Sequence, residues 1–275
     1  MAWGDVTPAE RLRSVTRRSV ADHNLASAAA DALAAFAPEP ASLVVACRQV
    51  LAHHPAHAPL WWLCARILAA PDPAGAARDA AQLLESDRTA DRLAAALPLL
   101  EDDEVVAVIG WPHAVDEALA ERIDVDAVAI RGEGVDTARE LRYRETERSV
   151  RVVERWDAAL AHVARLLVPA AAIGPATALV PAGTNATIEE LGRAVREVWL
   201  VGGVGRVLPA RLYDAAVAAT ETLYDETYAD VDDARPERLF LERVDRVAGP
   251  RGLESTIDAA ARPDCPVVPE LLKRR

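Results

Sequence analysis

His113 is the residue of this sequence whose type and place best suit proton transfer. It comes shortly after the Val-rich run 105–109, where an α/β domain would meet a ligand at the end of a strand. An imidazole titrates near neutral pH, so His113 could bind a phosphate or transfer a proton. The plainer alternative is a residue that begins a helix and has no catalytic task.

Two glycine-containing turns could bind an anion through backbone N–H groups. Gly203 and Gly205 follow an apolar run, and Arg206 could add a charge-assisted hydrogen bond. Gly183 and Thr184 precede a predicted helix, and a helix N-terminus favours phosphate. The alternatives are a tight turn that needs glycine for its backbone angles and an ordinary helix cap.

Histidine and cysteine patterns argue against a metal site. His53, His54 and His57 form the densest group of potential ligands, but Pro55 interrupts their helix and no Glu completes a metalloprotease motif. The three cysteines include no C-x-x-C pair, which also argues against a disulfide framework. We predict no metal, no cofactor and a reducing, cytoplasmic location.

Composition excludes several classes of partner. The formal net charge of −12 over 275 residues argues against a nucleic-acid groove, which would need a basic face. Hydrophobic residues make up 51% of the chain, which excludes disorder throughout. No uncharged apolar run reaches the ~18 residues that a membrane span needs. We therefore predict a soluble protein with neither nucleic acid nor membrane as a partner.

The first part of the chain predicts helices only. Thr7, Pro8 and Glu10 form a helix start with a capping box, and further helices are predicted over roughly 21–37, 40–54, 58–70, 73–85 and 88–99. Prolines separate these segments. The sequence therefore predicts an all-helical domain over residues 1–101.

The second part, residues 102–275, alternates short apolar runs with helical stretches. Strands are predicted over 105–109, 126–130, 150–153, 165–168 and 197–201, with an edge strand over 243–247. Helices are predicted over 112–122, 135–145, 156–164, 184–195 and 210–227. This alternation predicts a Rossmann-like α/β domain with a parallel sheet covered on both faces.

Four runs of this second part share their order with a known family. They are VVAVIGWPHAVDEAL at 105–119, DAVAIRGEGVDTARELRY at 126–143, LLVPAAAIGPATALVPAGT at 166–184 and EVWLVGGVGRVL at 197–208. After a helical domain, this order resembles the initiation factor 2B alpha/beta/delta family, which includes ribose-1,5-bisphosphate and methylthioribose-1-phosphate isomerases. The resemblance rests on the order of elements more than on identities.

The catalytic positions of the isomerases are changed in this chain. The resemblance aligns Gly110 with their acid/base cysteine, Ala171 with their aspartate, and Val180 and Pro181 with an Asn-Lys pair. Arg131 stands beside the segment aligned with their substrate loop and could contact a ligand. Moving a proton between adjacent sugar carbons requires two positioned acid/base groups, which Gly and Ala cannot supply.

The resemblance therefore implies a non-catalytic regulatory or scaffold subunit, with a pocket for a sugar phosphate or nucleotide near Arg131, Thr184 and Arg206. It also implies a homodimer or assembly with related subunits. One alternative is an aldose-ketose isomerase whose acid/base groups have moved to His113, Asp157 or Glu133. Another is a protein-interaction module on the same fold, because one fold hosts many functions.

Overall fold

The chain forms two compact units in the computed structural model, which describes residues 7–19, 24–100, 104–130, 150–153, 162–227 and 235–272. The helical unit comprises Met1–Asp87, Val204–Thr227 and Pro263–Arg275. The sheet unit comprises Arg88–Gly203 and Tyr228–Arg262. Helices precede a mostly parallel sheet, so the predicted α/β fold class is confirmed.

The helices of the helical unit begin where the sequence places caps and prolines. They are α1 (Pro8–Thr16), α2 (Leu25–Ala34), α3 (Pro40–His53), α4 (Ala58–Ala69), α5 (Pro73–Glu85), α10 (Ala210–Thr227) and α12 (Pro269–Leu272). The capping box is confirmed: Thr7 Oγ1 accepts from the Glu10 N–H at 3.3 Å, and the Glu10 carboxylate accepts from the Thr7 N–H at 2.9 Å. Asp72 caps α5 by accepting from the Gly75 N–H at 2.9 Å.

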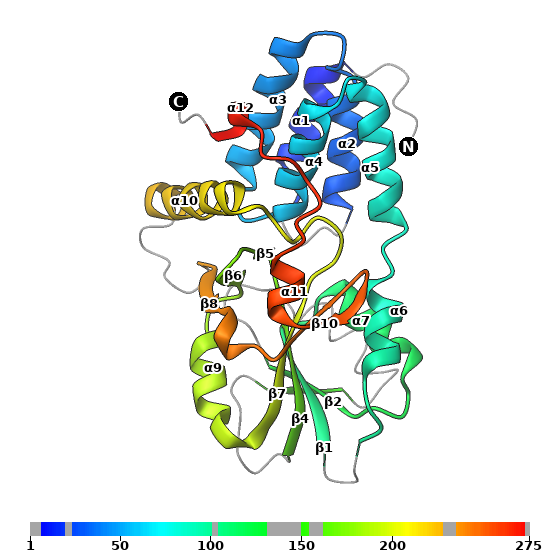
Figure 1. Ribbon diagram of the computed structural model, residues 1–275, viewed down its shortest axis with the longest axis vertical. Helices are drawn as coiled ribbons and strands as arrows, with labels where there is room; N and C mark the ends of the chain where they lie inside the picture. The colour runs from blue at the N-terminus through cyan, green and yellow to red at the C-terminus, as the bar shows by residue number, and fades with distance from the viewer. Residues whose placement is uncertain are drawn as a thin grey trace. The chain divides into compact units, whose positions relative to one another are not determined.

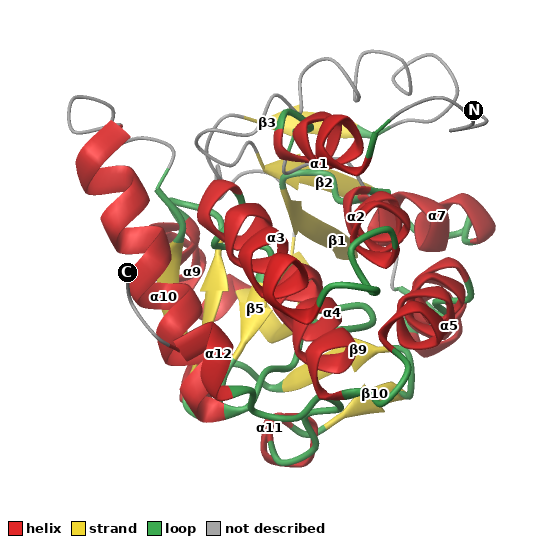
Figure 2. Cartoon of the chain, turned by 90° about the horizontal axis from the view of Figure 1, so that it is seen from above, coloured by secondary structure: helices red, strands yellow, loops and turns green. Residues whose placement is uncertain are grey.

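Apolar burial holds the helical unit together. Its fully buried side chains include Leu25, Leu33, Leu43, Trp62 and Ile67. Segments far apart in sequence share this unit, since α10 contacts both α4 and α12 (Figure 2). None of the helices in the described residues has a stretch long and apolar enough to cross a bilayer.

The sheet unit contains a seven-stranded sheet in the order β10-β9-β7-β4-β1-β2-β3. Its strands are β1 (Glu104–Ile109), β2 (Ala127–Ile130), β3 (Arg151–Val153), β4 (His162–Pro169), β7 (Val195–Val201), β9 (Arg246–Gly249) and β10 (Gly252–Glu254). All neighbouring pairs are parallel except β9 with β10. The central strands are buried on both faces, as a covered parallel sheet requires.

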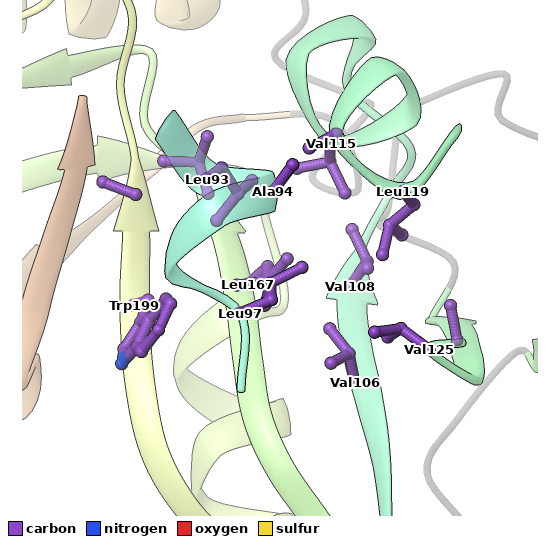
Figure 3. Packing of buried hydrophobic residues seen from close by; sticks show 14 of the residues in the cluster. Leu93, Ala94, Leu97, Val106, Val108, Val115, Leu119, Val125, Leu167 and Trp199 are labelled. Carbon is purple, nitrogen blue, oxygen red and sulfur yellow. The ribbon is translucent and has the colours of Figure 1, made fainter. Parts of the chain in front are cut away.

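A second, antiparallel sheet of order β5-β6-β8 lies in the same unit. Its strands are β5 (Ala172–Ile173), β6 (Thr177–Val180) and β8 (Glu237–Phe240), and the helices of the unit are α6 (Thr89–Ala96), α7 (His113–Glu121), α9 (Thr184–Leu191) and α11 (Thr256–Ala260). Helices α6 and α7 contact each other beside the large sheet (Figure 1). Leu93 of α6 and Leu97, which caps the end of that helix, join Val106, Leu167 and Trp199 of the strands in one hydrophobic core (Figure 3).

Several details of the sheet unit differ from the sequence prediction. The helix predicted over 156–164 is wrong for 162–164, because those residues belong to β4, where Val163 pairs with Val105 and Val195. The predicted edge strand appears as β9 at Arg246–Gly249, and β10 takes the edge position outside it. The β5–β6 hairpin lies between residues 168 and 184, where the sequence analysis predicts no strand.

The described structure does not test two other predictions. The helix predicted over 135–145 lies outside the described residues. The predicted domain boundary between residues 101 and 102 stays a prediction, because a division by contacts does not test which segments fold independently. Helix α6 nonetheless packs with the sheet unit.

Candidate functional site

The sheet unit has a topological switch point between β1 and β4. Strands β2 and β3 extend the sheet on one side of β1, and β4 begins the other side. Ligands of open α/β sheets bind outside the carboxyl ends of the strands at such a point. The residues that follow the two strands are Gly110 and Ala170. A ligand-binding site is therefore expected at this edge of the sheet.

Gly110 occupies a backbone position that suits glycine. Its φ is 67°, and its N–H donates to the Ile130 carbonyl at 2.8 Å. A residue with a Cβ pays about 1–2 kcal/mol in this left-handed region. The position aligned with the isomerases' cysteine therefore has a local geometry that disfavours cysteine.

His113 begins α7 at this edge, and its imidazole is half exposed to solvent. Its Nε2 lies 3.2 Å from Glu117 Oε1 one turn along the helix. The neighbouring Trp111 donates from Nε1 to Asp116 Oδ1 at 2.9 Å, which fixes the start of the same helix. His113 thus has a carboxylate that can orient it, but both side chains are open to water. Its catalytic role stays a prediction.

The start of α9 is built by Gly183 and Thr184. Gly183 has a φ of 79°, and the Thr184 hydroxyl is buried and donates to the Pro181 carbonyl at 2.6 Å. Val180, just before this turn, is a fully buried residue of β6. A lysine or asparagine at position 180 would bury a polar group, so the local core explains the apolar residue found there.

A carboxylate of the chain itself occupies the N-terminus of α9. Glu237 of β8 accepts a short hydrogen bond from the Asn185 N–H, the second N–H of the helix. The Asn185 side chain donates to the Arg238 carbonyl at 3.1 Å and accepts from Arg243 Nη1 at 3.0 Å. An anion is favourable at a helix N-terminus, and here Glu237 supplies it.

Replacing Glu237 by alanine is expected to lower the free energy of unfolding by about 1 kcal/mol, the usual value of a helix-capping contact. The physical reason is that the Asn185 N–H loses its acceptor. Urea denaturation followed by circular dichroism measures the loss, with Glu242→Ala as the control because Glu242 is exposed on the segment after β8. Equal stabilities of the two variants would show that the Glu237 contact contributes nothing.

The glycine turn after β7 also uses its backbone for an internal contact. The Val204 N–H donates to Asp87 Oδ2 at 2.8 Å. Gly205 has a φ of 75°, and a Cβ at this residue would lie 3.0 Å from Trp62 Cγ and 3.2 Å from Pro59 Cα. The turn therefore needs glycine both for its backbone angles and for close packing on α4.

Arg206 and His57 share a buried environment beside this turn. Burial lowers the pKa of Arg206 to about 10, and the nearby Asp87 carboxylate opposes that change. Burial, the positive charge of Arg206 and the neighbouring His54 hold the pKa of His57 well below its usual value. Arg206 is thus a cation inside the helical unit with a carboxylate beside it.

No group of three or more His, Cys, Asp or Glu side chains suited to a metal ion occurs in the residues that the structure describes. His53 is exposed on α3, and its Nδ1 lies 2.8 Å from the Gln49 carbonyl. His54 and His57 are instead buried. The three histidines therefore do not form a single cluster.

The predicted site residues divide between the two units. His113, Gly183, Thr184 and Gly203 belong to the sheet unit, whereas Gly205 and Arg206 belong to the helical unit. Arg131, Glu133 and Asp157 lie outside the described residues. The sequence analysis missed Glu237 and Asp87. Glu237 accepts from a backbone N–H 52 residues away, and Asp87 from one 117 residues away. A local sequence pattern cannot predict contacts between residues so far apart in the chain.

A helical unit and a mostly parallel sheet with a β1–β4 switch point define the class of fold. No protein-family model matches the sequence, and no curated protein matches it. Solved structures do match. The crystal structure of eIF2B beta from Chaetomium thermophilum has 12% sequence identity to this chain and a TM-score of 0.66. The match covers 92% of this chain and 89% of that one.

Two further solved structures agree with this comparison. The tetrameric eIF2B-beta2-delta2 complex from C. thermophilum contains a chain with 13% identity and a TM-score of 0.67, over 92% of this chain and 93% of that one. The delta subunit of translation initiation factor eIF-2B from A. fulgidus has 13% identity and a TM-score of 0.51, over 90% and 87%. The chain has the fold of eIF2B beta and delta subunits, as the resemblance in the sequence predicted.

Proposed function

We propose that this chain is a divergent initiation factor 2B-like protein that acts as a non-catalytic regulatory or scaffold subunit. One observation carries the proposal: each of the two turns that could bind a phosphate through backbone N–H groups donates one of these groups to a carboxylate of the chain itself. Glu237 accepts from Asn185, and Asp87 accepts from Val204. A phosphate at either place would meet a carboxylate of like charge, which is unfavourable.

The changed catalytic positions support the same proposal. Gly110 offers no side chain, and Ala171 has no ionisable group. An isomerase must both remove and return a proton at neighbouring carbons, so it needs two positioned acid/base groups. A pocket for a sugar phosphate or nucleotide, if retained, would have to use other groups, such as Arg131, which lies outside the described residues.

The alternative function is an aldose-ketose isomerase with relocated acid/base residues. The pairing of His113 with Glu117, at 3.2 Å, favours this alternative because a carboxylate can orient an imidazole for proton transfer. Against it stands the exposure of both side chains, since water competes with an exposed general base for substrate protons. We therefore place the isomerase second.

A subunit role implies assembly with a second copy or with a related chain. The solved beta2-delta2 structure is a complex of four chains, so a related arrangement is our expectation for this protein in the cytoplasm. Sedimentation velocity of the purified chain over a hundredfold concentration range tests it. We expect a species of twice the 29.5 kDa of one chain. A monomer at every concentration would contradict the homodimer.

A further inference from the structure

The chain passes between its two units at four places, and a hydrogen bond joins the residues at two of them. Asp87 ends the first segment of the helical unit, and Val204 begins the second. Asp87 Oδ2 accepts from the Val204 N–H at 2.8 Å. This contact lies wholly inside the helical unit, and it fixes where the turn 204–206 enters that unit.

The turn is held by packing as well as by this hydrogen bond. The Gly205 Cα faces the ring of Trp62 so closely that a Cβ would lie 3.0 Å from Trp62 Cγ. Trp62 is fully buried in α4, and its other neighbours include Arg66, whose guanidinium carbon lies 5.0 Å from the ring centroid. The turn therefore covers a tryptophan that would become exposed if the turn opened.

His57 is the buried titratable group beside the turn. Its side chain is buried, with the residue only 5% exposed, and Nδ1 has no hydrogen-bond partner among the described residues. The charged or titratable groups that face it are Arg206 from the turn and His54 from the end of α3. No carboxylate is among them, although Asp87 acts on Arg206.

We propose that His57, Asp87 and the turn 204–206 form an acid-sensitive clasp, in which protonation of His57 opposes Arg206 and releases the turn from α4. The neutral imidazole of His57 does not repel the buried guanidinium of Arg206, whose single positive charge is offset by the Asp87 carboxylate. An imidazolium adds a second positive charge in the same buried place, where no further carboxylate is available among the described residues. Opening the turn lets water solvate both cations.

The direction of the pH effect follows from the difference in the pKa of His57 between the closed and the open clasp. The pKa of His57 is lowered in the closed clasp by burial and by Arg206, and it returns toward its usual value when the turn opens. The open state therefore binds the proton more tightly, and acid favours it. With an ordinary histidine pKa of about 6.5, the opening equilibrium should rise about tenfold between pH 7.5 and pH 5.5.

Hydrogen exchange of the intact chain tests the clasp. The measured rate for peptides that cover residues 203–208, divided by the intrinsic rate at each pH, should rise about tenfold from pH 7.5 to pH 5.5. In His57→Gln the rise should fall below twofold, because glutamine does not titrate. His53→Gln is the matched control, since His53 is exposed and should leave the tenfold rise intact.

A second variant keeps the test decisive if His57→Gln does not fold. His57→Asn, which also cannot titrate, should likewise reduce the rise to less than twofold. A variant at Arg206 alone would leave most of the response, because burial is the largest cause of the lowered pKa of His57. Asp87→Asn should speed exchange at the Val204 N–H already at pH 7.5, because its acceptor is weakened. A pH-independent wild type, or a tenfold rise that persists in His57→Gln or in His57→Asn, would overturn the proposal.

Discussion

Gly205→Ala should lower the free energy of unfolding by about 2–5 kcal/mol. The left-handed φ of 75° costs a residue with a Cβ about 1–2 kcal/mol. The new Cβ would also lie 3.0 Å from Trp62 Cγ and 3.2 Å from Pro59 Cα. Overpacking of a buried site usually costs about 1–3 kcal/mol, and neither α4 nor the tryptophan ring can move away freely.

Gly192→Ala is the matched control for the strain. Gly192 has a φ of 48°, but a Cβ there would have nothing within 4 Å. Its ψ of −117° lies outside the left-handed helical region, so its variant should show only a backbone cost of about 1–3 kcal/mol. Urea denaturation followed by circular dichroism for both variants separates strain from packing. If Gly205→Ala is no less stable than Gly192→Ala, the claim that residue 205 packs too closely on Trp62 to accept a Cβ is wrong.

This comparison also bears on the two explanations of the glycine turn. A turn that exists to bind a phosphate would lose affinity on substitution, whereas a turn that exists to pack on α4 would lose stability. The contacts of Gly205 and Val204 favour packing. A stable Gly205→Ala protein with a lost phosphate response would favour the ligand site instead.

The sequence predicts much of the fold because its signals are local. The Val- and Ile-rich runs become the central strands β1, β2, β4 and β7, and the Thr7–Glu10 capping box starts α1 as expected. Strand β5 is too short to give a pattern, with only Ala172 and Ile173. Residues 162–164 carry a histidine and an alanine, so their pairing in β4 comes from the neighbouring strands rather than from local preference.

Helix α6 shows a different limit of the sequence. Leu93 and Ala94 give it an apolar face, which could pack on other helices or on a sheet equally well. The structure places that face on β1, β4 and β7 (Figure 3). A helix pattern fixes which side is buried, but not which element covers it.

The candidate site could be predicted only in outline. The sequence identifies the turns at 183–184 and 203–206 and the helix that begins near His113. It does not identify Glu237 or Asp87, because their partners are distant in the sequence and close only in the folded units. Whether a backbone N–H group is open to an anion therefore depends on the internal acceptors that only the folded structure shows.

The second large expected effect is an absence of catalysis. An isomerase accelerates its reaction by many orders of magnitude, typically 10⁶-fold or more. The chain has Gly110 and Ala171 where the resemblance places the acid/base groups, and internal carboxylates at both backbone N–H positions. We therefore expect no rate enhancement for ribose 1,5-bisphosphate or methylthioribose 1-phosphate.

The most direct test is the isomerisation of ribose 1,5-bisphosphate by the purified chain, measured by separation of substrate and product over hours. An isomerase of the family assayed in parallel shows that the substrate is competent, and a His113→Ala variant shows the source of any activity. We expect ribose 1,5-bisphosphate to be converted no faster than in buffer alone, both with the wild type and with His113→Ala. Turnover by the wild type that disappears in His113→Ala would contradict it and establish the relocated active site.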